Sequence, residues 1–281
     1  MPIVIENLSH VYMQGTQNEE VALKDITLTI EDGEYLGVIG HTGSGKTTLI
    51  QHINGLLKPT SGRILVYGTD LGAKKVDLRA IRRQVGIVFQ YPEYQLFEDT
   101  VEKDIAFGPK QLGIEPERIP QLVAEAMETV ELEDGLRSKS PLELSGGQKR
   151  RVALAGVIAM SPKTLILDEP MAGLDPQGRK SILRLSDKLH AQGKTIVMVS
   201  HSMDALSGRA DRIAVMKEGR LHRVGSMCEI FADVHYLREM GLKAPSSVLL
   251  CDALNRRGVA IPPCYTMEEA ADWLAKQVKP C

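Results

Sequence analysis

A glycine-rich stretch near residue 40 has the residue types and spacing that hold phosphate groups. The sequence GHTGSGKT occupies residues 40–47, after the apolar run YLGVI and before TLIQHINGLL. Glycines let successive backbone N–H groups point inward, and the N-terminus of a following helix adds positive partial charge. At this spacing the lysine reaches the β- and γ-phosphates of a nucleotide, and the next hydroxyl binds Mg²⁺. We therefore predict a site for ATP and Mg²⁺ formed by Gly40, His41, Thr42, Gly43, Ser44, Gly45, Lys46, Thr47 and Thr48.

Polar side chains also close three apolar runs that are typical of strands. TLILDEP (164–170) contains Asp168 and Glu169, VGIVFQ ends in Gln90, and VSH (199–201) ends in His201. Asp168 is placed to hold the Mg²⁺ shell and Glu169 to face an attacking water. The Gln90 amide suits the same shell, and His201 is expected near the γ-phosphate. The predicted catalytic residues are Glu169, His201, Lys46 and Gln90, and the predicted metal ligands are Thr47, Gln90 and Asp168.

The segment ELSGGQKRR (143–151) predicts a second anion site. Ser145, Gly146 and Gly147 precede a helix that runs through Arg150. A serine and two glycines at a helix start bind anions. Because the chain already has a phosphate loop, we interpret this segment as serving a nucleotide bound to another subunit.

The order of the expected elements indicates an α/β fold. The first ninety residues are rich in strand patterns, and residues 100–160 turn helical. Strands then return at 164–168, 195–200 and 212–216, with a helix-like segment between the first two. Continuous apolar strands alternating with helices favour a parallel sheet covered on both faces.

The tail from residue 222 differs in character. Residues 227–237 place apolar side chains on one helical face, and Thr266 with Glu269 forms a capping box. The second helical face consists of Met267, Ala270, Ala271, Leu274 and Val278. Two interpretations remain open, namely packing on the core and contact with a partner subunit.

Composition narrows the functional classes. The 281 residues include 34 basic and 36 acidic side chains, for a net charge of −2. The densest basic cluster, residues 149–151, is short. We therefore predict no nucleic-acid partner. The apolar run 152–160 falls well below the ~20 residues that span a bilayer. We expect no secretory signal in MPIVIENLSH. The four cysteines, Cys228, Cys251, Cys264 and Cys281, form no CxxC pair, which favours a reduced, cytosolic setting.

Over residues 3–220 the chain resembles the ABC-type ATPases. Their motifs occur in family order: Walker A (40–47), Q-loop (Gln90), signature (144–148), Walker B (165–169), D-loop (172–175) and H-loop (His201). The resemblance implies a P-loop NTPase domain at 1–221, with an N-terminal antiparallel β-subdomain, a RecA-like core and a helical subdomain at about 91–161. It also implies a head-to-tail dimer in which ATP meets Ser145, Gly146, Gly147, Gln148 and Asp175 of the other subunit, while Tyr12 stacks on adenine.

Residues 89–109 and 143–160 are similar to the ATPase subunits of energy-coupling factor (ECF) transporters, closest to the second, A-prime type. This resemblance implies bacterial uptake of vitamins or transition-metal ions from the cytoplasmic face of the cell membrane. The implied partners are a second ATPase (a paralogue or the same chain), a transmembrane coupling subunit and a substrate-binding membrane subunit. The tail, 222–281, is expected to join the two ATPases.

Residues 91–107 are expected to dock the coupling subunit. Tyr94, Leu96 and Phe97 are the expected apolar anchors. The acids expected to face basic residues of coupling helices are Glu93, Glu98, Asp99, Glu102 and Asp104. A solvated acidic loop with buried aromatic residues is the alternative for this segment.

One residue departs from the family pattern, and two other functional classes stay open. Met171 replaces the usual Thr or Ser after the Walker B proline. A soluble ABC-type ATPase acting on DNA would need a long coiled coil or a zinc insertion between Lys46 and Ser145, where the sequence has neither heptads nor cysteines. A small-molecule P-loop kinase would need no signature. The sequence leaves the transported substrate undecided, and also the identity of the partner ATPase.

Overall fold

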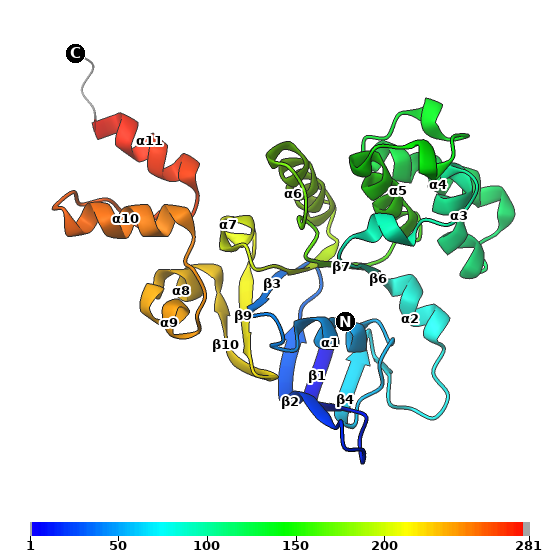
Figure 1. The fold of residues 1–281 in the computed structure, drawn as a ribbon, viewed down its shortest axis with the longest axis horizontal. Helices are drawn as coiled ribbons and strands as arrows, with labels where there is room; N and C mark the ends of the chain where they lie inside the picture. Colours follow the sequence, from blue (N-terminus) through cyan, green and yellow to red (C-terminus); the bar gives the residue numbers. More distant parts are fainter. Residues whose placement is uncertain (1, 278–281) are drawn as a thin grey trace.

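Two β-sheets form the centre of the molecule. The structure, a computed structural model, describes residues 2–277, so Val278 and Cys281 lie outside the described residues. The first sheet has the order β2-β1-β4-β5, and all its paired strands are antiparallel. Its strands are β1 (Ile3–Tyr12), β2 (Glu20–Ile30), β4 (Ser61–Val66) and β5 (Thr69–Asp70), drawn at the bottom of Figure 1. It is the expected antiparallel β-subdomain.

The second sheet has the order β10-β9-β3-β8-β7-β6. Its neighbours pair in parallel except for the β9–β10 hairpin. The strands are β3 (Tyr35–Gly40), β6 (Val85–Val88), β7 (Thr164–Asp168), β8 (Thr195–Val199), β9 (Arg212–Lys217) and β10 (Arg220–Ser226). The predicted parallel sheet is confirmed, and its carboxyl ends meet at one edge.

Both faces of this sheet are covered, as predicted. Alternate residues enter two separate cores: Leu165 and Leu167 belong to one, and Ile166 belongs to the other. The first core contains the helical subdomain with α6 (Pro176–Ala191) and α7 (Met203–Leu206). The second contains the β-subdomain with α1 (Lys46–Ile53) and α2 (Leu78–Gln84). The alternation follows from the period of two along a strand.

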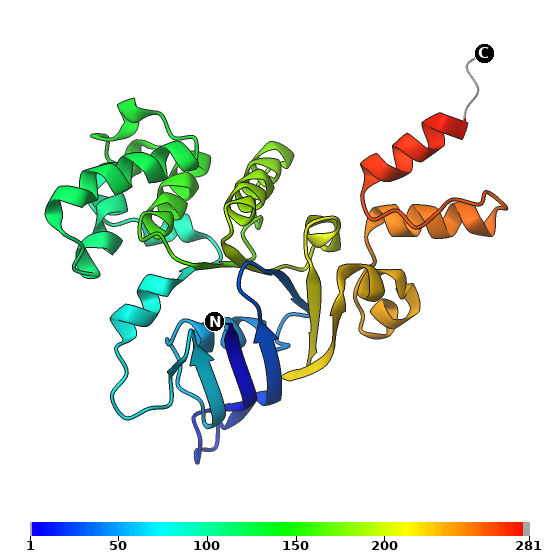
Figure 2. The same ribbon diagram turned by 180° about the vertical axis from the view of Figure 1, so that it is seen from behind.

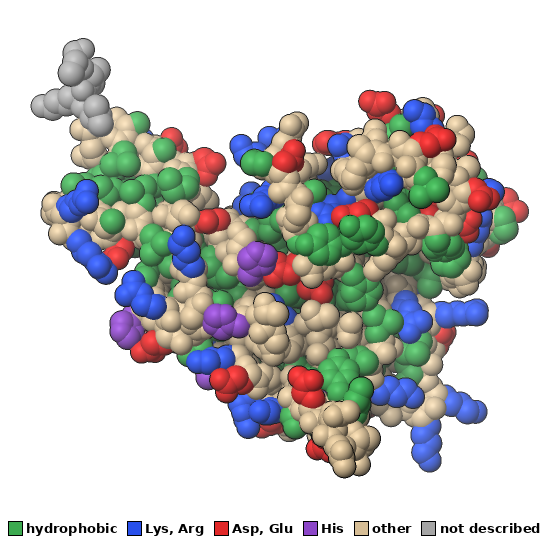
Figure 3. Space-filling model, viewed as in Figure 1, with side chains coloured by type: hydrophobic (Ala, Val, Ile, Leu, Met, Phe, Trp, Pro, Cys, Tyr) green, Lys and Arg blue, Asp and Glu red, His purple; other side chains and the backbone are tan. Residues whose placement is uncertain are grey.

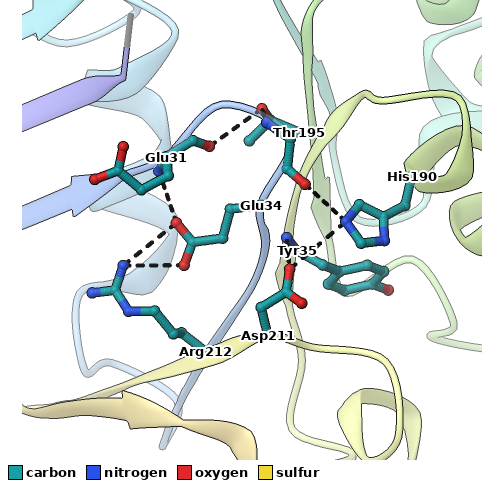
Figure 4. A network of polar contacts seen from close by, with 8 residues as sticks. Glu31, Glu34, Tyr35, His190, Thr195, Asp211 and Arg212 are labelled. Atoms are coloured by element: carbon teal, nitrogen blue, oxygen red, sulfur yellow. Dashed lines mark hydrogen bonds and ion pairs between the residues drawn. The ribbon is translucent and has the colours of Figure 1, made fainter.

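A polar network ties together the amino ends of β3, β8 and β9 (Figure 4). The buried Glu34 carboxylate accepts from Arg212 at 3.1 Å and from the Glu31 N–H at 2.7 Å. Asp211 accepts from the Tyr35 N–H at 2.8 Å. Burial raises the pKa of Glu34, which the nearby Arg212 opposes. These contacts hold the strands in register at the edge opposite their carboxyl ends.

A helical subdomain lies between β6 and β7. It consists of α3 (Val101–Gln111), α4 (Ile119–Thr129) and α5 (Gly146–Ile158), with short turns η1 (Pro92–Gln95), η2 (Pro116–Arg118), η3 (Asp134–Leu136) and η4 (Pro141–Glu143). Figure 2 shows it as a lobe at the opposite end of the molecule from the C-terminus. None of its described helices has the length of a coiled-coil arm.

The C-terminal segment has two parts. The expected single helical face is split at Asp233 into α8 (Met227–Ala232) and α9 (Val234–Glu239), because the Asp233 side chain caps α9 by accepting from Tyr236 N–H. Both helices pack on the main core. Beyond them, α10 (Ser246–Arg256) and α11 (Met267–Gln277) build a small core of their own around Cys251, Ile261 and Cys264.

The Thr266–Glu269 capping box is confirmed: the Glu269 N–H donates to Thr266 at 3.1 Å, and the Thr266 N–H donates to Glu269 at 3.2 Å. Strand β10 crosses the expected domain boundary at 221/222. Among the described residues, no helix is both long and apolar enough to cross a bilayer.

Candidate nucleotide site

A cavity of about 620 Å³ lies where β3, β7 and β8 end. It gathers residues from distant parts of the chain, because the carboxyl ends of parallel strands share one edge. The sequence-predicted residues in its wall are Tyr12, Thr42, Gly43, Gly45, Lys46, Thr47, Thr48, Gln90, Asp168, Glu169 and His201. Gly40 is the last residue of β3, and His41 and Ser44 belong to the loop between β3 and α1.

The loop between β3 and α1 has the backbone that a phosphate cradle needs. Gly43 and Gly45 have φ of +78° and +96°, a region that side chains with a Cβ rarely adopt. An added Cβ at Gly45 would lie 2.7 Å from the Ala22 carbonyl, whereas Gly43 faces open space. Gly45 is the residue before α1, so the helix N-terminus points into the cavity.

Lys46 is fixed over this loop. Its Nζ donates to the carbonyl oxygens of Gly40 and His41, both at 2.8 Å. The side chain is buried, and burial lowers the pKa of the amine, while the carboxylates of Glu169 and Asp168 oppose that shift. The cation is therefore held in place between two acceptors and two acids.

Thr47 and Asp168 face each other across the cavity floor. The Thr47 hydroxyl donates to Asp168 Oδ2 at 3.1 Å. Burial raises the pKa of Asp168, and the Thr47 hydrogen bond and the Lys46 charge oppose that shift. A hydroxyl and a carboxylate so placed offer hard oxygen ligands of the kind that Mg²⁺ prefers.

Glu169 and His201 form a direct pair. The His201 Nδ1 lies 2.7 Å from Glu169 Oε2, and the imidazole is 74% exposed while the carboxylate is 16% exposed. Burial raises the pKa of Glu169, and the His201 charge lowers it. Glu169 has φ of +46°, a left-handed backbone that is unusual for a residue with a long side chain. This geometry turns its side chain away from Asp168 and toward His201.

Tyr12 forms the far wall of the cavity. Its hydroxyl lies 3.2 Å from the Thr48 hydroxyl, and its ring packs edge-on against His10 with centroids 4.5 Å apart. His10 in turn contacts His52 of α1. The Tyr12 side chain is thus supported by His10 of β1 and by Thr48 of α1.

Sequence reasoning missed one side of the cavity. Glu20, Val21, Ala22 and Lys24 of β2 line it, together with Glu218 and Gly219 of the β9–β10 turn. The Gly219 N–H donates to the Ser44 carbonyl at 3.2 Å, and the Lys24 N–H donates to the Gly219 carbonyl at 2.8 Å. Only tertiary pairing brings these segments to the loop. No pattern in the sequence marks them, and only in the structure does the apolar Val21 stand out, with 45% of its surface exposed.

The signature residues and Asp175 lie apart from this cavity. Ser145 caps α5, with the Gln148 N–H donating to its hydroxyl at 3.3 Å, and Asp175 caps α6 by accepting from the Gly178 N–H at 2.7 Å. Both residues are exposed. An added Cβ at Gly146 or Gly147 would meet nothing within 4 Å, and neither has positive φ. The fold of this chain alone therefore does not require glycine at these two positions.

The acidic segment after Gln90 differs in part from the prediction. Glu93 bonds to the buried Arg150, and Asp104 accepts from the Phe97 and Glu98 N–H groups, both at 2.9 Å. Glu93 is therefore engaged by α5 and Asp104 by the backbone of its own segment, and a docking role for these two carboxylates stays a prediction. Asp99 and Glu102 pair with Lys103 and Arg137 on the surface. Tyr94 and Phe97 are 85% and 64% exposed, so buried aromatics are wrong for both residues, while Leu96 packs against the core.

Comparison with known proteins agrees with this geometry. The family model described as ABC transporter matches residues 23–172. The energy-coupling factor transporter ATP-binding protein EcfA2 of Caldanaerobacter subterraneus subsp. tengcongensis is 52% identical over 281 residues, which is 99% of this chain and 98% of that protein. Its namesake from Symbiobacterium thermophilum is 54% identical over 271 residues, which is 96% of this chain and 94% of that protein.

Solved structures agree with the fold. The cbiO1 protein of Clostridium perfringens, part of the ABC transporter complex cbiONQ, has a TM-score of 0.73 at 38% identity and covers 89% of this chain and 98% of its own. A dimeric ATP-binding cassette in a post-hydrolysis state with ADP and Pi has a TM-score of 0.71 at 29% identity, covering 80% and 98%.

The chain therefore belongs to the ABC transporter family of ATP-binding proteins, and it is an ATPase. Within that family it groups with the ATP-binding subunits of energy-coupling factor transporters.

Proposed function

We propose that the chain is one of two ATPase subunits that drive an ECF-type importer for vitamins or metal ions. It works from the cytoplasmic face of the cell membrane. There it joins a second ATPase, a transmembrane coupling subunit and a substrate-binding membrane subunit, and it has no nucleic-acid partner. The names and coverage of its relatives support this assignment.

The cavity is proposed to hold ATP. Tyr12 stacks on adenine, with Val21 beside it, and the N–H groups of the loop at 40–47 surround the phosphates. Ser44 and Thr48 flank Lys46 and Thr47 along this loop and the start of α1. The wall of the cavity includes both Tyr12 and Glu169 along with the loop residues, and its volume of about 620 Å³ suits a nucleoside triphosphate.

Mg²⁺ fits the donors that the cavity offers. Thr47 and Asp168 supply two hard oxygens, and Gln90 supplies an amide. Residues 2–277 contain no cluster of three His, Cys, Asp or Glu that would hold a metal ion by itself. A Mg²⁺ that takes most ligands from phosphates and water needs only such a set. When bound, it neutralises charge on the phosphates.

For hydrolysis, we propose that the Glu169 carboxylate orients an attacking water and accepts its proton. Its raised pKa favours proton acceptance, and the His201 contact fixes its direction. Lys46 and His201 then stabilise negative charge on the transferring phosphoryl group. Gln90 connects this region to the segment that follows it in the chain.

The exposure of the signature segment, residues 144–148, is the observation that supports a dimer most directly. Ser145, Gly146 and Gly147 form a helix N-terminus with open glycines, and they are absent from the wall of their own cavity. A second subunit's γ-phosphate is the anion that such a surface fits. We therefore propose head-to-tail pairing, with Gln148 and Asp175 bordering the same interface.

Residues 91–107 are proposed to contact the coupling subunit. Phe97 packs edge-on against Phe107 with centroids 4.8 Å apart, and both side chains reach the surface. Asp104 holds the intervening backbone, so the aromatic pair is presented on a rigid support. Exposed aromatic residues on rigid supports are common anchors of protein interfaces.

The test is an uptake assay in vesicles that carry the complete transporter. Phe97→Ala together with Gln95→Ala should reduce uptake about tenfold while the ATPase rate of the purified chain stays within twofold, because these exposed side chains face outward. Leu56→Ala is the matched control, since Leu56 is an exposed apolar residue outside the docking segment. Normal uptake in the double variant would refute the docking surface, and equal loss of both activities would indicate misfolding instead.

A further inference from the structure

The short segment between α9 and the first residue of α10, residues 241–246, contacts the phosphate-binding loop at one place and α7, which follows His201, at another. It begins where Gly241 closes α9, with φ of +65° and its N–H donating to the Arg238 carbonyl at 2.8 Å. It ends at Ser246, the first residue of α10. Between these points Ala244 and Pro245 are buried, so the connection is pinned at its centre.

The first contact is with the phosphate-binding loop. A Cβ added at Gly241 would lie 2.4 Å from His41 Nε2 and 2.8 Å from His41 Cε1. The Gly241 backbone therefore lies directly on the imidazole of His41. The carbonyl of this same His41 accepts from Lys46 Nζ at 2.8 Å. One residue thus contacts both the C-terminal segment and the lysine of the phosphate site.

The second contact is with α7, which follows His201. The Asp204 carboxylate accepts from the Ser246 N–H at 2.6 Å and from the Ser246 hydroxyl at 2.9 Å. Asp204 lies three positions after His201 and caps the start of α10. An acid at a helix N-terminus also gains from the helix dipole.

The two residues that follow α7 also support the start of α11. The Ser207 hydroxyl donates to the Tyr265 carbonyl, and an added Cβ at Gly208 would lie 2.4 Å from the Thr266 side chain. By contrast, Figure 3 shows the surface hollowed between α6 and the C-terminal helices. A cavity of about 760 Å³ lies there. The segments α7 and 241–246 are therefore among the places where α10 and α11 meet the catalytic core, next to Val248, Leu249 and Tyr265, which pack on the main core directly.

We propose that residues 241–246 are a positioning element that couples the nucleotide site to α10–α11, through His41 on one side and Asp204 on the other. This inference rests on the proposed nucleotide site. Movement of the loop around phosphates shifts the His41 ring against Gly241, and movement of His201 shifts Asp204 against Ser246. Coupling of this kind is reciprocal. If bound nucleotide stabilises one arrangement of α10 and α11, then stabilising that arrangement raises the affinity for nucleotide by the same free energy.

Hydrogen exchange of the full chain tests the proposal. With a non-hydrolysable ATP analogue and Mg²⁺, we expect slower exchange in the loop at 40–47 and also in α10 and the start of α11. In Asp204→Ala the loop should still be protected, while the change in α10 should fall to less than a third. Asp204→Glu should restore part of that change.

Asp187→Ala is the matched control. Asp187 forms a partly buried ion pair with Arg209 beside the same hollow, and its hydrogen bond goes to Arg209 and not to residues 241–246. It should keep the full nucleotide response in α10. If Asp204 were merely structural, its loss would raise α10 exchange equally with and without nucleotide, and the proposal would be overturned.

The outcomes separate the two proposals. An analogue that protects the loop but leaves α10 of the parent chain unchanged contradicts the coupling alone. An analogue that fails to protect the loop contradicts the nucleotide site itself. Gly241→Ala gives an independent check, because it should push on His41 and raise the KM for ATP more than it lowers kcat. An unchanged KM in that variant would count against the His41 contact.

Discussion

The pair of Glu169 and His201 shows what individual side chains contribute at the cavity. A buried carboxylate with a raised pKa is a better proton acceptor than a solvated one, and the imidazole at 2.7 Å fixes its orientation. Lys46, held by two carbonyl oxygens, supplies a cation that needs little reorganisation when phosphates bind. The site is thus largely preorganised by contacts within this chain.

Tyr12 gives a prediction for nucleotide affinity. Tyr12→Ala should weaken ATP binding by roughly 5- to 150-fold, since stacking of a base on an aromatic ring contributes about 1–3 kcal/mol. Tyr12→Trp should stay within about threefold of the parent. Inorganic tripolyphosphate, which has no base, should compete equally well in all three proteins when a fluorescent ATP analogue is displaced. Equal loss of tripolyphosphate binding would show that Tyr12 acts through the loop and not through adenine.

At this scale the sequence predicted the residues whose motifs have fixed spacing. Lys46, Thr47, Asp168, Glu169, Gln90 and His201 lie around one cavity as expected. Val21, Glu218 and Gly219 were missed because no local pattern marks a residue that reaches the cavity only through strand pairing. The internal hydrogen bonds of Glu93 and Asp104 were also missed, because a count of charges does not reveal which carboxylates are engaged within the chain.

At the scale of elements, Arg150 joins three segments. This residue of α5 is 3% exposed and bonds both Glu93 carboxylate oxygens, at 3.0 and 3.2 Å. It also donates to the Ala172 carbonyl at 2.8 Å and lies over the Tyr91 ring. The signature helix, the segment after Gln90 and the D-loop are therefore connected by one guanidinium group. The sequence showed only a short basic cluster at 149–151.

Arg150→Ala should lower the free energy of unfolding by about 3 kcal/mol, because it leaves Glu93 without its partner in a partly buried place. ATP binding should change less than threefold, whereas coupled hydrolysis and uptake should both fall. Urea unfolding and vesicle uptake measure the two effects. Arg151→Ala, which removes an exposed hydrogen bond to the Glu131 carbonyl, is the control. A stability loss as small as that of the control would contradict the described role.

The small core of α10 and α11 predicts uneven cysteine reactivity. Burial and the neighbouring Cys251 thiol raise the pKa of Cys264 to about 11, while Cys228 is exposed. Only thiolate reacts with iodoacetamide, so at pH 8 Cys228 should be labelled at least ~10 times faster than Cys264. Because the folded pKa is raised, the gap should narrow as the pH rises toward 11. Peptide mapping after timed quenching measures both rates, and equal labelling at pH 8 would mean that this core opens freely.

At the scale of the whole molecule, the continuous apolar runs alternating with helical patterns were enough to predict the parallel sheet, since strands buried on both faces are apolar throughout. The break at Asp233 was not predicted, because an apolar face continues across it and only the cap shows where α8 ends. A basic patch on the surface was also missed. Lys and Arg side chains project over α2 and the preceding loop in Figure 3. The exposed basic residues there include Lys74, Lys75, Arg79 and Arg83. The packing of Gly241 against His41 of the phosphate-binding loop was not predicted either, because it depends on tertiary structure and leaves no pattern in the sequence.

The central claim is that this cavity and the signature of a partner subunit enclose one ATP, and that Glu169 promotes its hydrolysis. The variant Glu169→Gln tests this claim most directly. In the transporter complex purified from native membranes, the variant should bind ATP within about threefold of the parent. It should retain ATP and a closed ATPase pair through gel filtration, and turnover at its site should fall at least ~100-fold. Steady-state turnover equal to that of the parent, with no retained ATP, would contradict the account.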